Sequence, residues 1–185
     1  MPFFLPVDFE SALPENINGR LSDDQLKAIE LMLRARKITG YILFFCELFQ
    51  VAIAGPAFLF SEWGPTQRGL QAMIGIYAFI SFAAMIWGLV IIKKASAAKL
   101  ILGSIKVTLV TGTPTKYNYT TTYRSMGGAT HLATLKGGWL SIAGVSYGVL
   151  PGELYSSIPP NEESDFYYIT LPMTGFKKYL VVNFF

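Results

Sequence analysis

The fold of this chain is decided by ITGYILFFCELFQVAIAGPAFLF at residues 38–60 and QAMIGIYAFISFAAMIWGLVII at residues 71–92. Each stretch has about 22 residues, and a helix of roughly 20 residues crosses the ~30 Å hydrocarbon layer of a bilayer. The short connection between them, SEWGPTQRGL, contains the turn signals Gly64-Pro65 and Gly69. We therefore predict a hairpin of two antiparallel transmembrane helices over residues 38–92.

The composition agrees with two membrane spans. The chain is 52% hydrophobic and only 15% charged, whereas soluble domains average about 25% charged residues. The formal net charge is +3, and residues 93–185 hold nine basic against four acidic residues. This excess is too weak to indicate nucleic-acid binding. It favours contact with the anionic headgroups of a lipid bilayer.

Basic residues gather at one end of the predicted hairpin. Six of them flank the outer ends of the two spans, and Arg68 alone lies in the connection. The positive-inside rule then predicts that both termini are cytoplasmic, in an integral protein of a bacterial inner membrane. Trp63 and Trp87 suit the aromatic belts at the two interfaces. The six flanking residues are Arg34, Arg36, Lys37, Lys93, Lys94 and Lys99.

An amphipathic helix is predicted over residues 22–37, directly before the first span. Ser22 and Gln25 have the S-x-x-Q spacing of a capping box, in which each side chain binds the backbone N–H of the other residue. No breaker separates this helix from the span that follows. Two i,i+4 ion pairs are expected on its surface, Asp23–Lys27 and Glu30–Arg34.

The remaining segments are an irregular N-terminal arm at residues 1–21 and a cytoplasmic β-rich domain at residues 101–185. Prolines and Gly19 interrupt the arm. The domain is rich in threonine, tyrosine and β-branched residues, which predicts five or six short strands. We expect them to form a small antiparallel barrel or sandwich. The clearest strand segments are SIKVTLVTGT, TKYNYTTTY, WLSIAGVSYGVL, DFYYITLP and KYLVVNFF, with turn signals at Gly112-Thr113-Pro114, Gly137-Gly138, Pro151-Gly152 and Pro159-Pro160-Asn161.

Glu47 and Gln50 form a polar pair inside the first span, on the same side of the helix. An ionised carboxylate at the centre of the hydrocarbon costs at least ~2.5 kcal/mol, so Glu47 should face protein, water or a partner. One interpretation is polar contact between helices, and the other is a proton or ion relay. A relay needs several polar stations, and the second span offers Tyr77 and Ser81, so we favour the structural role.

Small residues mark a packing face on the second span. Ala84 and Gly88 have small-xxx-small spacing, and Ser81 extends the same face. Small side chains let two helix backbones approach closely in a membrane. This face can serve the hairpin itself or an outside helix.

The sequence contains none of the motifs that carry common chemistry. His131 and Cys46 are single and far apart, so no cysteine–histidine nucleophile is predicted. Zinc motifs and phosphate-binding glycine loops are absent. The spans contain no histidine to ligate haem. We predict a protein that is not an enzyme and has no cofactor or metal.

The chain resembles a group of uncharacterised bacterial membrane proteins with two spans and a C-terminal β-rich domain. The resemblance rests on the helix start Gly19-Arg20-Leu21-Ser22, the segment Tyr167–Pro172 and the apolar ending Tyr179–Phe185. It implies the architecture and no known activity. A weaker architectural likeness is to NfeD-type proteins, in which transmembrane helices precede an OB-like barrel.

Three functions are compatible with these features. We favour a non-catalytic, membrane-anchored accessory or scaffold subunit of a larger membrane complex, with other membrane subunits as partners in a hetero-oligomer. A respiratory or photosynthetic complex is a candidate host. The first alternative is a homo-oligomeric proton- or ion-conducting element built around Glu47. The second is a membrane-tethered binding module with an OB- or SH3-like barrel.

Overall fold

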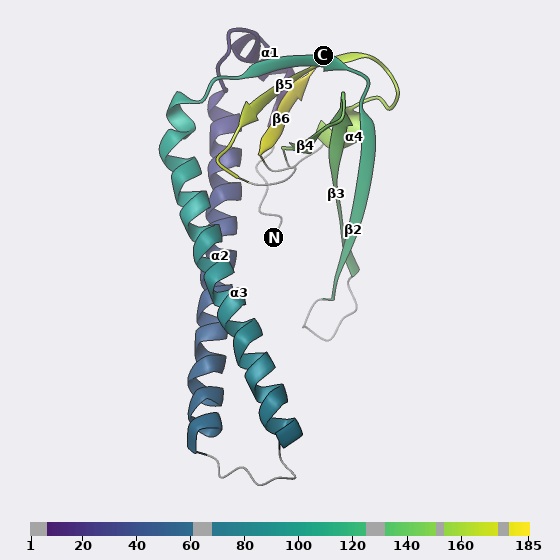
Figure 1. Ribbon diagram of the computed structural model, residues 1–185. Helices are drawn as coiled ribbons and strands as arrows, with labels where there is room; N and C mark the ends of the chain where they lie inside the picture. The colour runs from purple at the N-terminus through teal and green to yellow at the C-terminus, as the bar shows by residue number, and fades with distance from the viewer. Residues whose placement is uncertain (1–6, 61–67, 125–131, 151–153, 174–177) are drawn as a thin grey trace. The chain divides into compact units, whose positions relative to one another are not determined.

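The computed structural model describes residues 7–60, 68–124, 132–150, 154–173 and 178–185. The chain divides into two units (Figure 1). We call Leu33–Ala97 the helical unit, and Met1–Met32 together with Ala98–Phe185 the β unit.

The helical unit contains most of two long helices. Helix α2 runs from Asp23 to Phe60 and α3 from Arg68 to Ile101. The predicted amphipathic helix and the predicted first span are thus a single helix, because no breaker separates them. In the part of the chain that the structure describes, Ala72–Ser104 is long and apolar enough to cross a membrane, with a mean hydropathy of 2.2.

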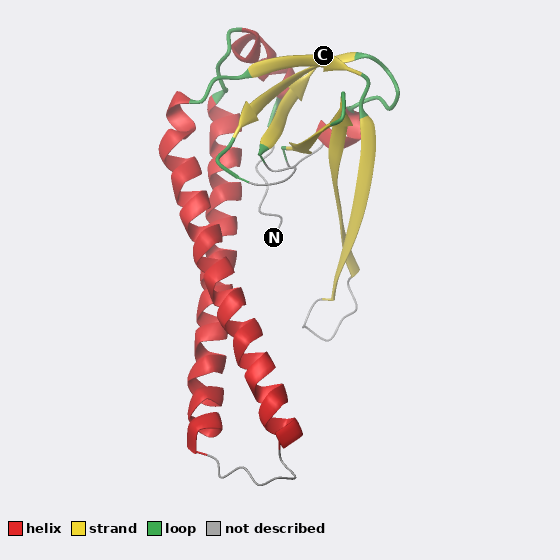
Figure 2. Cartoon of the chain, viewed as in Figure 1, coloured by secondary structure: helices red, strands yellow, loops and turns green. Residues whose placement is uncertain are grey.

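The β unit contains a curled, mixed six-stranded sheet that forms a half-barrel (Figure 2). Its order is β1-β5-β6-β4-β3-β2, so β1 and β2 are the edges. The described strands are β1 (Thr108–Gly112), β2 (Thr115–Arg124), β3 (Leu132–Ile142), β4 (Val145–Val149), β5 (Ser164–Thr170) and β6 (Tyr179–Phe184).

The prediction of a wholly antiparallel barrel or sandwich is wrong in one respect, because β4 and β6 pair in parallel. Strand β5 forms an antiparallel pair with β6 on one side and with β1 on the other. Strand β6 therefore enters the sheet between β5 and β4, and its direction matches that of β4. The helix α4 (Leu154–Ser157) lies in the connection that makes this crossover possible.

The predicted strand WLSIAGVSYGVL is two strands, since the chain turns back at Ala143-Gly144. Ile142 pairs with Val145, so the turn has two residues. Both have positive φ, 49° at Ala143 and 78° at Gly144, which is the conformation of a type I′ hairpin turn. Alanine rarely adopts this conformation, so the turn could not be recognised from the residue types alone.

Gly137-Gly138, predicted as a turn, lies within β3. A Cβ built on Gly138 would fall 2.2 Å from Cζ of Tyr155. Glycine is therefore needed here because an aromatic ring covers the strand backbone. The ring of Tyr155 also lies 5.1 Å from the ammonium of Lys116 on β2.

The core of the β unit lies around β6, which is buried along most of its length. Its central position in the sheet explains the apolar run Leu180-Val181-Val182. Strand β5 contributes Phe166 and Ile169, which are fully buried. Other buried apolar side chains of this core are Leu140, Ile142, Leu150, Leu154, Ile158 and Leu171.

The N-terminal arm at residues 1–21 is not irregular throughout, because helix α1 spans Phe9–Ile17. The Asp8 carboxylate caps this helix by accepting hydrogen bonds from the N–H groups of Glu10 and Ser11, at 3.1 and 3.2 Å. Ala12 is fully buried. Capping and burial outweigh the unfavourable Pro14 inside the helix.

A buried cluster of three amide side chains joins α1, the start of α2 and the last strand. Asn16, Gln25 and Asn183 are each at most 2% exposed. Gln25 Nε2 donates to Asn16 Oδ1 at 2.9 Å, and Asn16 Nδ2 donates back to Gln25 Oε1 at 2.8 Å. Asn183 Nδ2 donates to Asn16 Oδ1 at 3.1 Å. We call these three residues the amide cluster.

The amide cluster also binds the backbone of three segments. Gln25 Nε2 donates to the carbonyl of Val182 at 3.0 Å, and Asn183 Nδ2 donates to the carbonyl of Phe9 at 2.7 Å. The predicted capping box is confirmed, with the Ser22 N–H donating to Gln25 Oε1 at 3.0 Å and the Gln25 N–H to Ser22 Oγ at 3.3 Å. One glutamine thus caps α2 and ties it to β6.

We predict that Asn16→Ala destabilises the β unit by about 2 kcal/mol, since a buried polar group that loses its partner costs about 1–3 kcal/mol. Amide hydrogen exchange of β6 in the full chain should accelerate about 30-fold. Asn18→Ala is the matched control, because Asn18 is exposed and bonds only the Pro14 carbonyl through its side chain among the described residues. Equal acceleration in both variants would show that the amide cluster does not hold the unit together.

Candidate functional site

The polar residues inside the helical unit are the first candidate site. The Tyr77 hydroxyl on α3 donates to Gln50 Oε1 on α2, so this part of the polar pair is a contact between the two helices. Glu47 is half-buried on α2. No hydrogen bond or ion pair reaches Glu47 from any residue that the structure describes. The two members of the pair therefore have different surroundings.

The small-residue face of α3 meets a glycine of α2. A Cβ on Gly88 would lie 2.9 Å from the Gly40 carbonyl oxygen and 3.0 Å from the Phe44 nitrogen. Ser81 is 2% exposed and Ala84 is half-buried. The backbones therefore approach too closely for any side chain at Gly88. No feature of the sequence pairs Gly40 with Gly88, so this contact was not predicted.

Large apolar side chains remain exposed along both helices of the helical unit. On α2 the exposed set includes aromatic residues, with Phe49 67% exposed. On α3 Phe79 is 73% exposed. Contiguous apolar surface of this extent is rare on soluble monomers and marks contact with a membrane or a partner. Further members of the set are Ile42, Phe45, Leu48, Ile53, Met73, Ile76, Ile80, Phe82, Ile86 and Leu89.

The basic residues predicted to flank the spans belong to the helical unit, apart from Lys99. Arg34 and Lys93 are exposed, whereas Arg36, Lys37 and Lys94 are half-buried. The Lys37 ammonium lies 5.9 Å from the centre of the Tyr41 ring. Of the two predicted belt tryptophans, Trp87 is 59% exposed and Trp63 lies outside the described residues.

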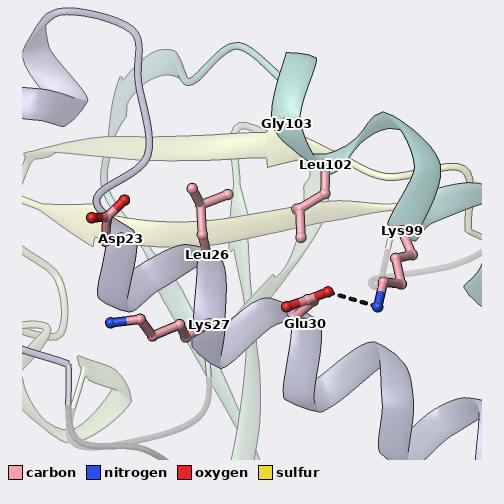
Figure 3. A pocket seen from close by; sticks show the side chains of 7 residues that line it. All are labelled: Asp23, Leu26, Lys27, Glu30, Lys99, Leu102 and Gly103. Carbon is pink, nitrogen blue, oxygen red and sulfur yellow. Dashed lines mark ion pairs between the residues drawn. The ribbon is translucent and has the colours of Figure 1, made fainter.

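A shallow pocket of about 480 Å³ lies in the β unit, between the start of α2 and the end of α3 (Figure 3). Figure 3 shows the Lys99 ammonium reaching the Glu30 carboxylate, at 2.7 Å. The other ammonium that lines the pocket, on Lys27, pairs with Asp24 at 3.2 Å. Lys27 therefore pairs with Asp24 and not with Asp23 as predicted, and Glu30 pairs with Lys99 and not with Arg34. The full lining is Asp23, Leu26, Lys27, Glu30, Lys99, Leu102 and Gly103.

The charges of this pocket argue against a binding role for small ions. Two carboxylates and two ammonium groups line it, so its net charge is zero. All four side chains of its two ion pairs are about half exposed or more. Exposed pairs of this kind contribute about 0–1 kcal/mol. The pocket neither concentrates one sign of charge nor desolvates a reactive group.

Three tyrosines from β4, β5 and β6 form an aromatic cluster in the β unit. The ring centres of Tyr147, Tyr168 and Tyr179 lie 5.2 to 5.8 Å apart. Burial, followed by the proximity of Tyr168 and Tyr179, raises the pKa of the Tyr147 hydroxyl. A hydroxyl with a raised pKa stays protonated at neutral pH and is a poor base or nucleophile. Aromatic rings at these separations contribute about 0.5–1.5 kcal/mol per pair, so the cluster stabilises the sheet.

No group of three or more metal-ligating side chains occurs within the described ranges. Comparison with known proteins found no matching protein-family model, no matching curated protein and no matching solved structure. The resemblance to two-span bacterial membrane proteins therefore remains an interpretation of the sequence.

We predict that Gly88→Ala weakens the packing of α2 on α3 by about 1–3 kcal/mol, because backbone atoms block the added methyl group. Gly75→Ala on the same helix is the matched control. A Cβ at Gly75 has nothing within 4 Å, so alanine there should be neutral or stabilising by up to about 1 kcal/mol. Thermal unfolding in detergent measures both variants. A Gly88→Ala chain as stable as Gly75→Ala would contradict the close approach.

Proposed function

We propose that this chain is a non-catalytic, membrane-anchored accessory or scaffold subunit of a larger membrane protein complex. In this proposal both α2 and α3 cross the bilayer, with residues 38–60 and 71–92 in the hydrocarbon. Both termini and the β unit lie on the cytoplasmic side of a bacterial inner membrane. The orientation is supported by the basic residues at the outer ends of both segments.

The second span is supported by the exposed apolar face of α2. The side chains of Ile42, Phe45, Phe49 and Ile53 are each at least 59% exposed. Burying a side chain of this kind away from water contributes about 1.5–3 kcal/mol. A helix that presents all of these side chains to water would be strongly unfavourable. In the proposal, lipid covers them, because the apolar segment is long enough to cross the hydrocarbon layer.

A partner subunit is supported by Glu47, and this observation carries the proposal. The carboxyl group lies in the middle of the apolar segment of α2, and its side chain is half-buried. Gln50, its neighbour one turn later, is bonded to Tyr77. Because a polar group in hydrocarbon is retained only with a partner, a donor from another subunit is the simplest way to accommodate Glu47.

The same observation favours one second candidate, a homo-oligomer that conducts protons or ions around Glu47. Two spans are too few to enclose a pore, so several copies would have to supply the pathway. The Gln50–Tyr77 contact argues for the first candidate. A relay would need the side chains of Gln50 and Tyr77 as polar stations, and here they bond the two helices to each other.

We predict that the tagged chain, extracted gently from its native membrane, migrates within a hetero-oligomer well above its own 20.5 kDa. Glu47→Ala should release it, because the donor on the partner then loses its acceptor. Leu48→Ala is the matched control, since Leu48 is the adjacent exposed residue and offers no hydrogen bond. Native electrophoresis and mass spectrometry of the tagged species measure the outcome.

Three results would count against the proposal. A strictly monomeric chain in every mild detergent would contradict a scaffold role. An assembly of this chain alone, with flux through liposomes that Glu47→Gln abolishes, would establish the conducting homo-oligomer instead. Release by Leu48→Ala as readily as by Glu47→Ala would show that Glu47 makes no special contact.

A further inference from the structure

We infer that the basic residues of the helical unit form a docking surface for anionic lipid headgroups. The inference rests on the proposed membrane anchor and adds a lipid class to it. The surface, which we call the basic belt, consists of Arg34, Arg36, Lys37, Lys93 and Lys94. It requires phosphate-bearing headgroups of net negative charge, such as phosphatidylglycerol.

The contact between α2 and α3 brings the two parts of the basic belt to one level. A Cβ on Gly40 would lie 3.0 Å from the Gly88 carbonyl oxygen, and 2.8 and 3.1 Å from side-chain carbons of Ile92 and Ile91. Residues 34–37 lie one to two turns before Gly40, and residues 93–94 directly follow Ile92. Because the helices run antiparallel within the helical unit, both sets flank the same end of the glycine contact.

The positive charge of the basic belt is not neutralised within the described chain. Residues 33–40 and 88–97 contain no aspartate or glutamate. The nearest carboxylate before Arg34 along α2 belongs to Glu30, and that group pairs with Lys99. In the described ranges the ion pairs are Lys27–Asp24 and Lys99–Glu30, so none involves the basic belt. Five positive charges at one level of the helical unit attract anions that are not part of the described chain.

Arg36 contributes a guanidinium that no described carboxylate neutralises. Its Nε is buried and has no hydrogen-bond partner among the described residues, so Nε itself is not open to a ligand. The side chain as a whole is half-buried, and the terminal N–H groups of an arginine can bind a phosphate through two parallel hydrogen bonds. Lys37 stacks on the ring of Tyr41, an arrangement that suits the interface between headgroups and acyl chains.

The neighbouring apolar surface favours a lipid over an acidic protein as the occupant. Directly beyond the basic belt on α2 come Tyr41 and Ile42, and before it on α3 come Trp87 and Leu89, all exposed. Charge followed within one or two turns by exposed apolar side chains matches the boundary between headgroups and hydrocarbon. An acidic protein surface would satisfy the charge and leave these side chains uncovered.

The test uses the full chain with Trp87 as its one tryptophan, in a Trp63→Phe, Trp139→Phe background, inserted in phosphatidylcholine vesicles. Fluorescence quenching by brominated phosphatidylglycerol is compared with quenching by brominated phosphatidylcholine. Each basic residue near an anionic surface favours binding by up to about fivefold. We expect phosphatidylglycerol to associate several-fold more strongly near Trp87, and this preference to disappear near 1 M salt, where the Debye length is about 3 Å.

The variant Arg34→Gln/Arg36→Gln/Lys37→Gln should lose the preference. Its matched control changes the net charge equally on the β unit, with Lys27→Gln, Lys106→Gln and Lys178→Gln, and should keep it. Equal quenching by both lipids in the unaltered chain, a preference that survives high salt, or equal loss in both variants would overturn the inference and leave the anchor intact. Absence of quenching by either lipid would instead count against the proposed membrane anchor.

Discussion

The need to keep the apolar side chains of α2 and α3 out of water constrains the rest of this protein. Two helices packed only on each other bury one stripe apiece, and the remaining faces stay exposed, as Phe49 and Phe79 do. In the proposed membrane anchor, lipid would relieve this constraint. The glycine contact at Gly88, the bond from Tyr77 to Gln50, and Glu47, which has no partner among the described residues, would then all serve contacts between helices inside the membrane.

The β unit depends on a different interaction, the amide cluster. Gln25 binds the Val182 carbonyl across 157 positions of sequence, so the first turn of α2 is fixed by nearly the last residues of the chain. A contact between such distant segments costs the loop-closure entropy of the intervening chain. The amide cluster therefore makes the order of α1, the start of α2 and β6 interdependent.

Local signals in the sequence predicted the two long helices, the capping box and the approximate number of strands, but not α1 or α4. They could not predict what depends on distant partners. Gln25 was recognised as a cap, but its second role requires Asn16 and Asn183, which no spacing connects to it. The parallel β4–β6 pair likewise joins strands that are not consecutive in the chain, and the turn at Ala143 has a positive φ that alanine rarely adopts. The polar pair was predicted as a pair, whereas the structure gives Gln50 a partner and leaves Glu47 without one among the described residues.

In the proposed anchor, α2 crosses the bilayer together with α3. Spin labels introduced through Leu48→Cys and Phe82→Cys, in a Cys46→Ser background, test it in lipid vesicles. We predict that both labels collide more readily with oxygen, which concentrates in hydrocarbon, than with a water-soluble nickel chelate. A label at Leu48 that favours the nickel chelate, while the label at Phe82 favours oxygen, would show that α2 lies in water and that the chain has a single span.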